Sequence, residues 1–167
     1  MSETEQQQIF REWLASYRAL LFKVIRAYAF NADDQNDLFQ EVCLQVYRSI
    51  PNFKAESAVS TWLYRIALNT AIKWSMKERK HTDGRQEIGT MAHLLQSGEE
   101  PKNERIAWLY SEIKQLNEID RSLTLLLLDG YSYKEMAEMM GISESNIGVK
   151  IHRIKKHLVN KSKELRT

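Results

Sequence analysis

The stretch YSYKEMAEMMGISESNIGVKIHRIKKHL, residues 131–158, predicts two helices joined by a tight turn. Within SYKE, Ser132 and Glu135 have the spacing of a capping box, which predicts a helix over residues 133–140. Gly141 stands where a helix ends in left-handed backbone. Residues 144 to about 161 have helical periodicity, so a second, longer helix is expected there.

The second helix divides into an apolar face and a cationic face. The apolar positions follow spacings of four, three and four residues and comprise Ile147, Ile151, Ile154 and Leu158. We expect this stripe to close a small core with Met136, Met140 and Ile142. The opposite side and the turn before it carry hydroxyl, amide, apolar and basic groups, on Ser143, Ser145, Asn146, Val149, Lys150, His152, Arg153 and Lys156.

This layout is that of a helix-turn-helix, whose second helix enters the DNA major groove with its N-terminal half at the base edges. Residues 150–166 contain seven cations and one acid, and such cations release counterions from DNA phosphates. A charge run alone is more often only a solvated helix face. The capping box, the turn at Gly141 and the polar face occur at the relative positions that a helix-turn-helix requires. Their combination favours DNA binding.

The remaining sequence predicts an all-α protein of two small helical domains joined by a flexible linker. The 167 residues include only 6 Gly and 2 Pro, few for a β-sandwich or barrel. Helices are expected from residue 10 to about 30, over 34–50, and from 60 or 61 to about 80. Residues 81–103 carry four acids and two cations without a sustained helical period, which indicates the linker. Helices over 104–116 and 121–128 precede the helix pair, so the domains are 1–80 and 104–167.

Several classes of protein are excluded by what the sequence contains. The single cysteine, Cys43, permits no intramolecular disulfide. The N-terminus lacks the pattern of a signal peptide, and the longest apolar run, residues 125–128, is too short to cross a membrane. We therefore predict a cytoplasmic protein. No phosphate loop, nucleophile elbow or HExxH motif occurs, and the four histidines form no metal-like cluster with Cys43. We predict no catalytic residue, no metal and no cofactor.

The N-terminal domain offers two further candidate surfaces. On the helix over residues 34–50, one exposed face mixes acidic, amide, apolar and basic side chains. This mixture is equally consistent with a surface that binds a protein partner and with a face that is only solvated. In STWLYRIALN, a face with Trp62, Arg65 and Asn69 can stack a base, hold phosphates and read a base edge. The preceding loop, NFKAESAVS, can receive an unstacked base. The residue pattern alone favours a structural role, with Trp62 in the core and Asn69 as a surface amide, over a role in DNA binding.

A family resemblance favours the DNA-binding interpretation of this face over the structural one. The run DLFQEVCLQVYRSI…NF…TWLYRIALNTAIKW resembles region 2 of the bacterial extracytoplasmic-function sigma factors, a subfamily of the sigma-70 family. RSLTLLLLDGYSYKEMAEMMGISESNIGVKIHRIKKHL resembles their region 4. Order, spacing and total length also match. The resemblance implies a dissociable subunit of RNA polymerase that binds the core enzyme through its β′ clamp and β subunits, selects the promoter and helps to open the duplex.

The resemblance implies three sets of site residues. Contacts to the coiled coil of the β′ clamp are implied for Asp37, Leu38, Gln40, Glu41, Leu44 and Arg48. Residues 52–61 would be the loop that captures a base flipped from the non-template strand of the −10 element. The candidates to line this loop are Phe53, Ala58, Ser60 and Thr61, and the residues that would support the loop or touch the melted strand are Trp62, Tyr64, Arg65 and Asn69. Lys73 joins the −10 set because helical period places it on the same face as Trp62, Arg65 and Asn69. The polar face of the last helix, with the eight residues named above, would read the −35 element.

The last helix departs from the pattern of many relatives, which carry Gly-Thr-Val-Lys-Ser-Arg where this chain has SNIGVK, residues 145–150. A cation is lost at Gly148, and Lys150 cannot read guanine in the bidentate manner of arginine. Asn146 can instead address adenine, and Val149 a thymine methyl. We expect a −35 preference that depends less on guanine.

Two further expectations concern regulation and the main alternative. The acidic linker resembles region 3.2 of the family, which threads toward the active-site channel of polymerase. The expected regulator is an anti-sigma factor that keeps regions 2 and 4 away from polymerase. The alternative is a stand-alone helix-turn-helix regulator with an N-terminal sensory domain, which would bind its operator without polymerase.

Overall fold

The computed structural model describes residues 1–82 and 103–165, apart from the side chains of residues 79–82. These residues form α-helices, one short 3-10 helix and turns, which confirms the all-α prediction. The chain divides into two compact units, Met1–Glu100 and Pro101–Thr167. Residues 83–102, most of the predicted linker, lie outside the described residues.

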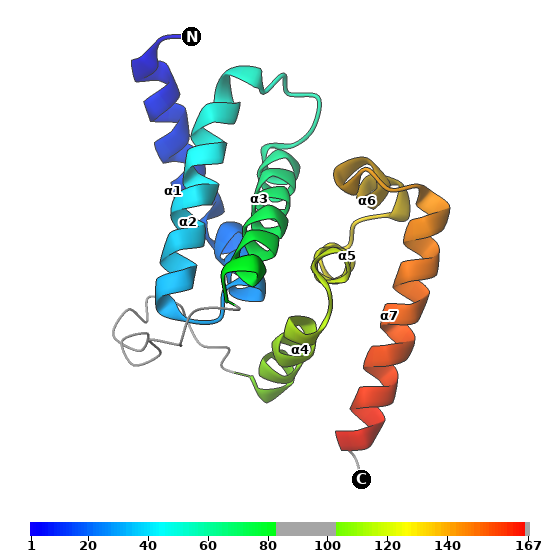
Figure 1. The fold of residues 1–167 in the computed structure, drawn as a ribbon. Helices are drawn as coiled ribbons and strands as arrows, with labels where there is room; N and C mark the ends of the chain where they lie inside the picture. Colours follow the sequence, from blue (N-terminus) through cyan, green and yellow to red (C-terminus); the bar gives the residue numbers. More distant parts are fainter. Residues whose placement is uncertain (83–102, 166–167) are drawn as a thin grey trace. The chain divides into compact units, whose positions relative to one another are not determined.

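Three α-helices of the N-terminal unit pack against one another: α1 (Glu3–Tyr28), α2 (Ala32–Ser49) and α3 (Val59–Thr82) (Figure 1). The 3-10 helix η1 (Ile50–Asn52) follows α2 and contacts both α1 and α2. The centre of the unit consists of fully buried aliphatic side chains, including Leu21, Val24, Ile25, Leu38, Val42, Val46, Leu63 and Leu68. Burying each large aliphatic side chain contributes about 1.5–3 kcal/mol.

Capping side chains extend two helices beyond their predicted starts. α1 begins at Glu3 rather than near Phe10, because Ser2 and Glu5 form a capping box. The Glu5 amide donates to Ser2 Oγ at 3.2 Å, and the Ser2 amide donates to Glu5 Oε2 at 3.4 Å. α2 begins at Ala32, because the Asn31 side chain accepts from the Asp34 amide at 2.8 Å. The apolar period alone does not mark these first turns, because their residues are mostly polar.

The C-terminal unit contains α4 (Glu104–Gln115), α5 (Glu118–Leu128), α6 (Tyr133–Met140) and α7 (Glu144–Leu165). α5 begins three residues before its predicted start, because Asn117 Oδ1 accepts from the Asp120 amide at 2.9 Å. α6 and α5 both contact α7, and α6 lies beside the N-terminal half of α7 (Figure 1).

The predicted helix-turn-helix is confirmed, with one change in its core. The Glu135 amide donates to Ser132 Oγ at 3.1 Å, and the Ser132 amide donates to Glu135 Oε1 at 2.9 Å. Gly141 ends α6 with φ 67°, in the left-handed region. Met136 and Met139 are buried, whereas Met140 is half-buried. Both Met139 and Met140 lie on the same side of the helix as Met136, so tertiary packing and not the period decides between them.

The capping box of α6 makes stability depend on pH. Hydrogen bonds from the Ser132 amide and with the Ser132 side chain lower the pKa of Glu135 from its ordinary 4.5. A lowered folded-state pKa contributes stability above the unfolded value, and this contribution is lost as the pH falls through the folded pKa. Glu135→Gln is expected to lower the melting temperature at pH 7 and to lose that deficit as the pH is lowered below 4.5. Thermal unfolding of both proteins between pH 7 and pH 3 checks this, and a deficit of equal size at both ends would contradict it.

Candidate functional site

The loop of residues 53–58, which joins η1 to α3, is held at its start by aromatic packing. The half-buried Phe53 lies against Trp62 on α3, with ring centroids 5.4 Å apart and planes at 58°. Trp62 Nε1 donates to Ser49 Oγ at 3.2 Å, and Ser49 Oγ donates to the carbonyl of Val46 at 2.8 Å. Trp62 is half-buried, so it is neither a core residue nor a fully exposed ring on which a base could stack. It joins the loop to the end of α2.

The rest of this 53–58 loop projects into solvent. Residues 54–58 are all exposed, including the predicted contact Ala58. Ala55 has φ 57°, a left-handed conformation that is uncommon for a residue with a side chain. Ser60 and Thr61, at the start of α3, are half-buried. The loop therefore combines a fixed base with an accessible, unusually shaped tip.

Next to the loop, α3 presents a polar face with Arg65, Asn69 and Lys73, all three exposed at intervals of four residues. These side chains are accessible to a ligand, as predicted. Tyr64 is different, because it is only 1% exposed and its ring lies 6.0 Å from Lys23 Nζ. The prediction that Tyr64 touches DNA is therefore corrected: the helical period turns Tyr64 inward with the core residue Leu63.

The neighbouring α2 presents the face predicted for a protein partner. Four of the predicted contacts are exposed polar residues, namely Asp37, Gln40, Glu41 and Arg48. Leu44 lies among them and is 41% exposed, which is unusual for a large apolar side chain. Leu38 is fully buried with Val42 and Val46, so its predicted contact with a partner is corrected to a core role.

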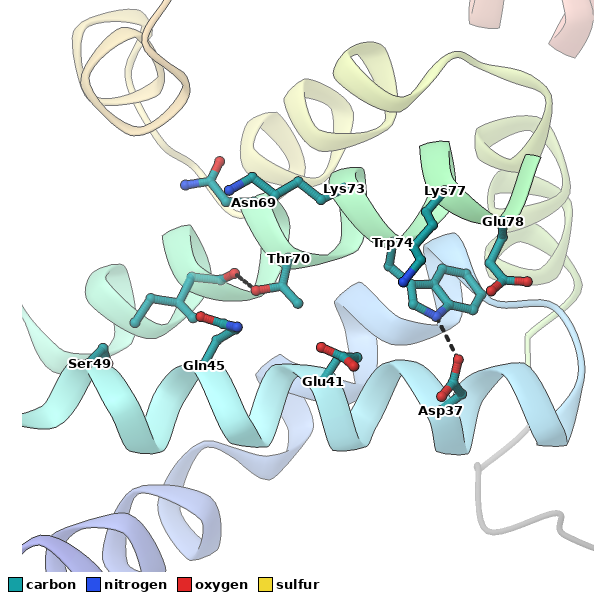
Figure 2. Close-up of a pocket in the computed structure, with 11 residues that line it drawn as sticks. Asp37, Glu41, Gln45, Ser49, Asn69, Thr70, Lys73, Trp74, Lys77 and Glu78 are labelled. Atoms are coloured by element: carbon teal, nitrogen blue, oxygen red, sulfur yellow. Dashed lines mark hydrogen bonds between the residues drawn. The ribbon is translucent and has the colours of Figure 1, made fainter. Parts of the chain in front are cut away.

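An open groove of about 480 Å³ lies between these two faces (Figure 2). Asp37 and Glu41 line it from α2, whereas Lys73 and Lys77 line it from α3. The α2 wall is thus acidic, whereas the α3 wall carries two lysines together with Glu78. Trp74 Nε1 donates to Asp37 Oδ2 at 2.9 Å and joins the two walls.

Among the residues of this arrangement that sequence reasoning missed are Trp74 and Ser49. Trp74 lies four residues after Thr70 on the inward side of α3, so helical period could have placed it between the helices. Nothing in the sequence pairs it with Asp37, which is 37 positions away. Ser49 gave no local signal, because its partner Trp62 belongs to another helix.

The second polar surface lies on α7. Ile147, Ile151 and Ile154 are buried, and the opposite side is open as predicted. The exposed members of the predicted set are Ser143, Ser145, Asn146, Val149, His152, Arg153 and Lys156, while Lys150 is half-buried. Val149 is 60% exposed, the position expected of an apolar group that meets a base. Ser143 also caps the helix, because its Oγ accepts from the Asn146 amide at 3.2 Å.

Gly148 leaves a gap in α7 beside Tyr133 of α6. A Cβ atom at position 148 would lie 3.8 and 3.9 Å from two ring carbons of Tyr133, an ordinary van der Waals distance. Glycine within a helix costs about 0.5–1 kcal/mol relative to alanine. Gly148→Ala is therefore expected to raise the free energy of unfolding by about 0.5–1 kcal/mol in urea titrations. Gly141→Ala is the control and should destabilise, because φ is 67° there.

Nothing in the described part of the chain suggests a metal centre or a membrane segment. Within residues 1–78 and 103–165, whose side chains are described, no group of three or more His, Cys, Asp or Glu side chains is placed to bind a metal ion. Across the same residues, no helix has both the length and the apolar character needed to span a bilayer.

Comparison of the sequence with known families identifies both units. Residues 13–81 match sigma-70 region 2, and residues 106–158 match sigma-70 region 4. The chain is 27% identical over 171 residues to the ECF RNA polymerase sigma-E factor of Escherichia coli strain K12, covering 95% of this chain and 89% of the relative. It is 29% identical over 148 residues to the protein of the same name from Haemophilus influenzae, covering 80% and 77%.

Two solved structures share this fold. The chain has a TM-score of 0.68 and 20% identity to the sigma factor RpoE, solved in complex with the anti-sigma factor NepR from Bartonella quintana, with 93% of this chain and 98% of that chain covered. It has a TM-score of 0.61 and 18% identity to CnrH, solved in complex with the cytosolic domain of CnrY, with 95% and 90% covered.

Proposed function

The chain belongs to the extracytoplasmic-function (ECF) subfamily of the sigma-70 family, and we propose that its exposed surfaces divide promoter initiation among three tasks. It is an RNA polymerase sigma factor, which joins the core enzyme and recognises promoter DNA. In our proposal, α2 binds the core, α3 with the 53–58 loop binds the −10 element, and α7 binds the −35 element. Helix α3 lies in the region 2 match and α7 in the region 4 match.

The charges on the exposed faces of α2 and α3 support this division. Glu41 and Asp37 on α2 would repel DNA phosphates, so the α2 face suits a protein surface. Lys73 and Arg65 on α3 attract phosphates, and Asn69 between them can hydrogen-bond a base edge. The α2 face therefore points to polymerase and the α3 face to the melted strand.

The 53–58 loop supports capture of a base from the −10 element. Strand opening needs no chemical step from this chain, only a site that binds the unstacked base better than the duplex does. The exposed tip offers that access, and the packing of Phe53 on Trp62 fixes its start. We accordingly propose that the chain has no catalytic residue of its own and acts in the cytoplasm, where polymerase works.

On α7, the proposed division of labour follows position along the helix. Asn146 and Val149, in the N-terminal half, are placed to meet base edges. Arg153 and Lys156 lie further along and suit phosphates. The −35 preference that we propose leans on adenine and thymine rather than guanine. A selection of bound sequences that returned a core of guanine alone would rule this preference out.

Regulation by an anti-sigma factor is the proposal best supported by the structural relatives, two of which were solved with such a partner or a partner domain. An anti-sigma factor would cover the α2 face or the α7 face and so compete with polymerase or DNA. The proposed boundaries of the two domains are residues 1–80 and 104–167.

The alternative of a stand-alone regulator with a sensory domain is not supported, because residues 13–81 match sigma-70 region 2. Co-elution with core polymerase on a sizing column tests the proposed function directly. We expect a one-to-one complex whose promoter binding far exceeds that of either component. A protein that elutes apart from core, and binds promoter duplex equally well alone, would refute the proposal.

A further inference from the structure

Trp13 on α1 contacts the 53–58 loop through Phe53, although α1 belongs to neither proposed DNA surface. The rings of Trp13 and Phe53 are 5.3 Å apart at 88°, an edge-to-face arrangement. Phe53 lies also against Trp62 at 5.4 Å. Phe53 is thus held by two tryptophans, one from α1 and one from α3.

This packing fixes the end of the loop from which the strained tip begins. The Phe53 amide donates to the carbonyl of Ile50 at 3.1 Å, so backbone and side chain are both held at this residue. Two positions later, Ala55 adopts φ 57°. Left-handed backbone at a residue with a Cβ atom persists only where the surroundings impose it. Residues 54–58 are exposed and offer little packing of their own.

We propose that Trp13 is a positioning residue for base capture: it fixes Phe53 and thereby holds the 53–58 loop in its capturing shape before DNA arrives. This inference rests on the proposed function of the loop. A loop that is ordered in advance loses less conformational entropy when it binds. Trp13 acts through Phe53 and does not itself touch the base, so its removal slows strand opening without weakening attachment to polymerase.

The chain contains a matched control on the same helix. Phe10 makes the same kind of contact with Tyr47 of α2, with centroids 5.5 Å apart at 89°. Like Trp13, Phe10 is half-buried. This second pair joins α1 to α2 and does not involve the loop. Trp13→Leu and Phe10→Leu therefore remove equivalent edge-to-face pairs, and only the first pair includes a residue of the loop.

The test compares both variants as assembled holoenzymes on a promoter with a fluorescent base analogue in the −10 element. We expect Trp13→Leu to slow opening about three- to tenfold, the range of one aromatic pair. Phe10→Leu should change opening less than twofold, and both should keep wild-type affinity for core. Trp13→Phe, which retains an edge-to-face ring, should recover most of the rate.

A double-mutant cycle decides whether Trp13 acts through Phe53. If it does, Trp13→Leu adds little to the defect of Phe53→Leu, whereas independent effects would multiply. If Trp13→Leu does not fold, the cycle is run with Trp13→Met, which also removes the ring. Opening at the wild-type rate, equal defects in the Trp13 and Phe10 variants, or multiplying defects would each overturn the inference. Failure of the wild-type holoenzyme to open the promoter would instead overturn the proposed function of the loop.

Discussion

Replacing Leu44 with glutamate is expected to weaken binding to core RNA polymerase about 100-fold, close to 2.7 kcal/mol. Leu44 is the exposed apolar side chain at the centre of the polar α2 face. If that face docks on polymerase, glutamate there must be desolvated without a partner, which adds to the lost apolar contact. The free energy of unfolding should change far less than the free energy of binding, since Leu44 lies at the surface and is 41% exposed.

Fluorescence anisotropy of labelled protein titrated with core measures this effect. Val159→Glu is the matched control, because Val159 is a 53% exposed apolar residue on α7 of the other unit. It should leave affinity for the isolated core nearly unchanged. Equal affinities for wild type and Leu44→Glu would show that α2 does not form the polymerase contact.

Replacing Asn146 with alanine is the second change with a large expected effect. It should weaken binding of the holoenzyme to its preferred −35 sequence by about 1–3 kcal/mol and relax the choice of base at one position. The helix should remain intact, because the backbone amide of Asn146, and not its side chain, donates the capping hydrogen bond to Ser143 Oγ.

Arg153→Ala provides the contrast to Asn146→Ala. Arg153 is exposed further along the same face, where we place phosphates. Its loss should weaken all sequences alike and reduce the slope of log affinity against log salt concentration by about 1. Binding selections at two salt concentrations separate the two behaviours. Uniform weakening by Asn146→Ala, with no loss of base preference, would contradict the assignment of Asn146.

The helix-turn-helix was the part of the structure most completely predictable from sequence, because its determinants are local. Ser132 and Glu135 cap α6 within one turn, and Gly141 ends it in left-handed backbone. The buried isoleucines of α7 follow the helical period, and the same period predicts which residues lie on the opposite, exposed face. Most of the residues assigned to the −35 element are accordingly exposed.

Features that depend on contacts between helices were not predictable in the same way. Leu38 and Tyr64 fall within family contact motifs, yet packing in the three-helix core buries both. The bond between Trp74 and Asp37 joins α3 to α2 across 37 positions, and no spacing rule connects them. The contact of Trp13 with Phe53 arises in the same way, from a helix that the sequence had not linked to any function.

The bond between Trp74 and Asp37 also has a consequence for how the two proposed surfaces cooperate. It ties the helix assigned to polymerase to the helix assigned to the −10 element beside their shared groove (Figure 2). A hydrogen bond to a charged group contributes about 1.5–3 kcal/mol. If α2 docks on polymerase as proposed, this bond helps to hold α3 in its orientation beside α2.

The most direct test of the central claim is strand opening measured with and without core polymerase. A promoter carries a fluorescent base analogue in its −10 element, and the signal is recorded with the protein alone, core alone and both together. The account predicts opening only with both, and loss of opening when Asn69 and Arg65 are changed to alanine, with affinity for core unchanged. Tight duplex binding by the protein alone, with no opening when core is added, would contradict it.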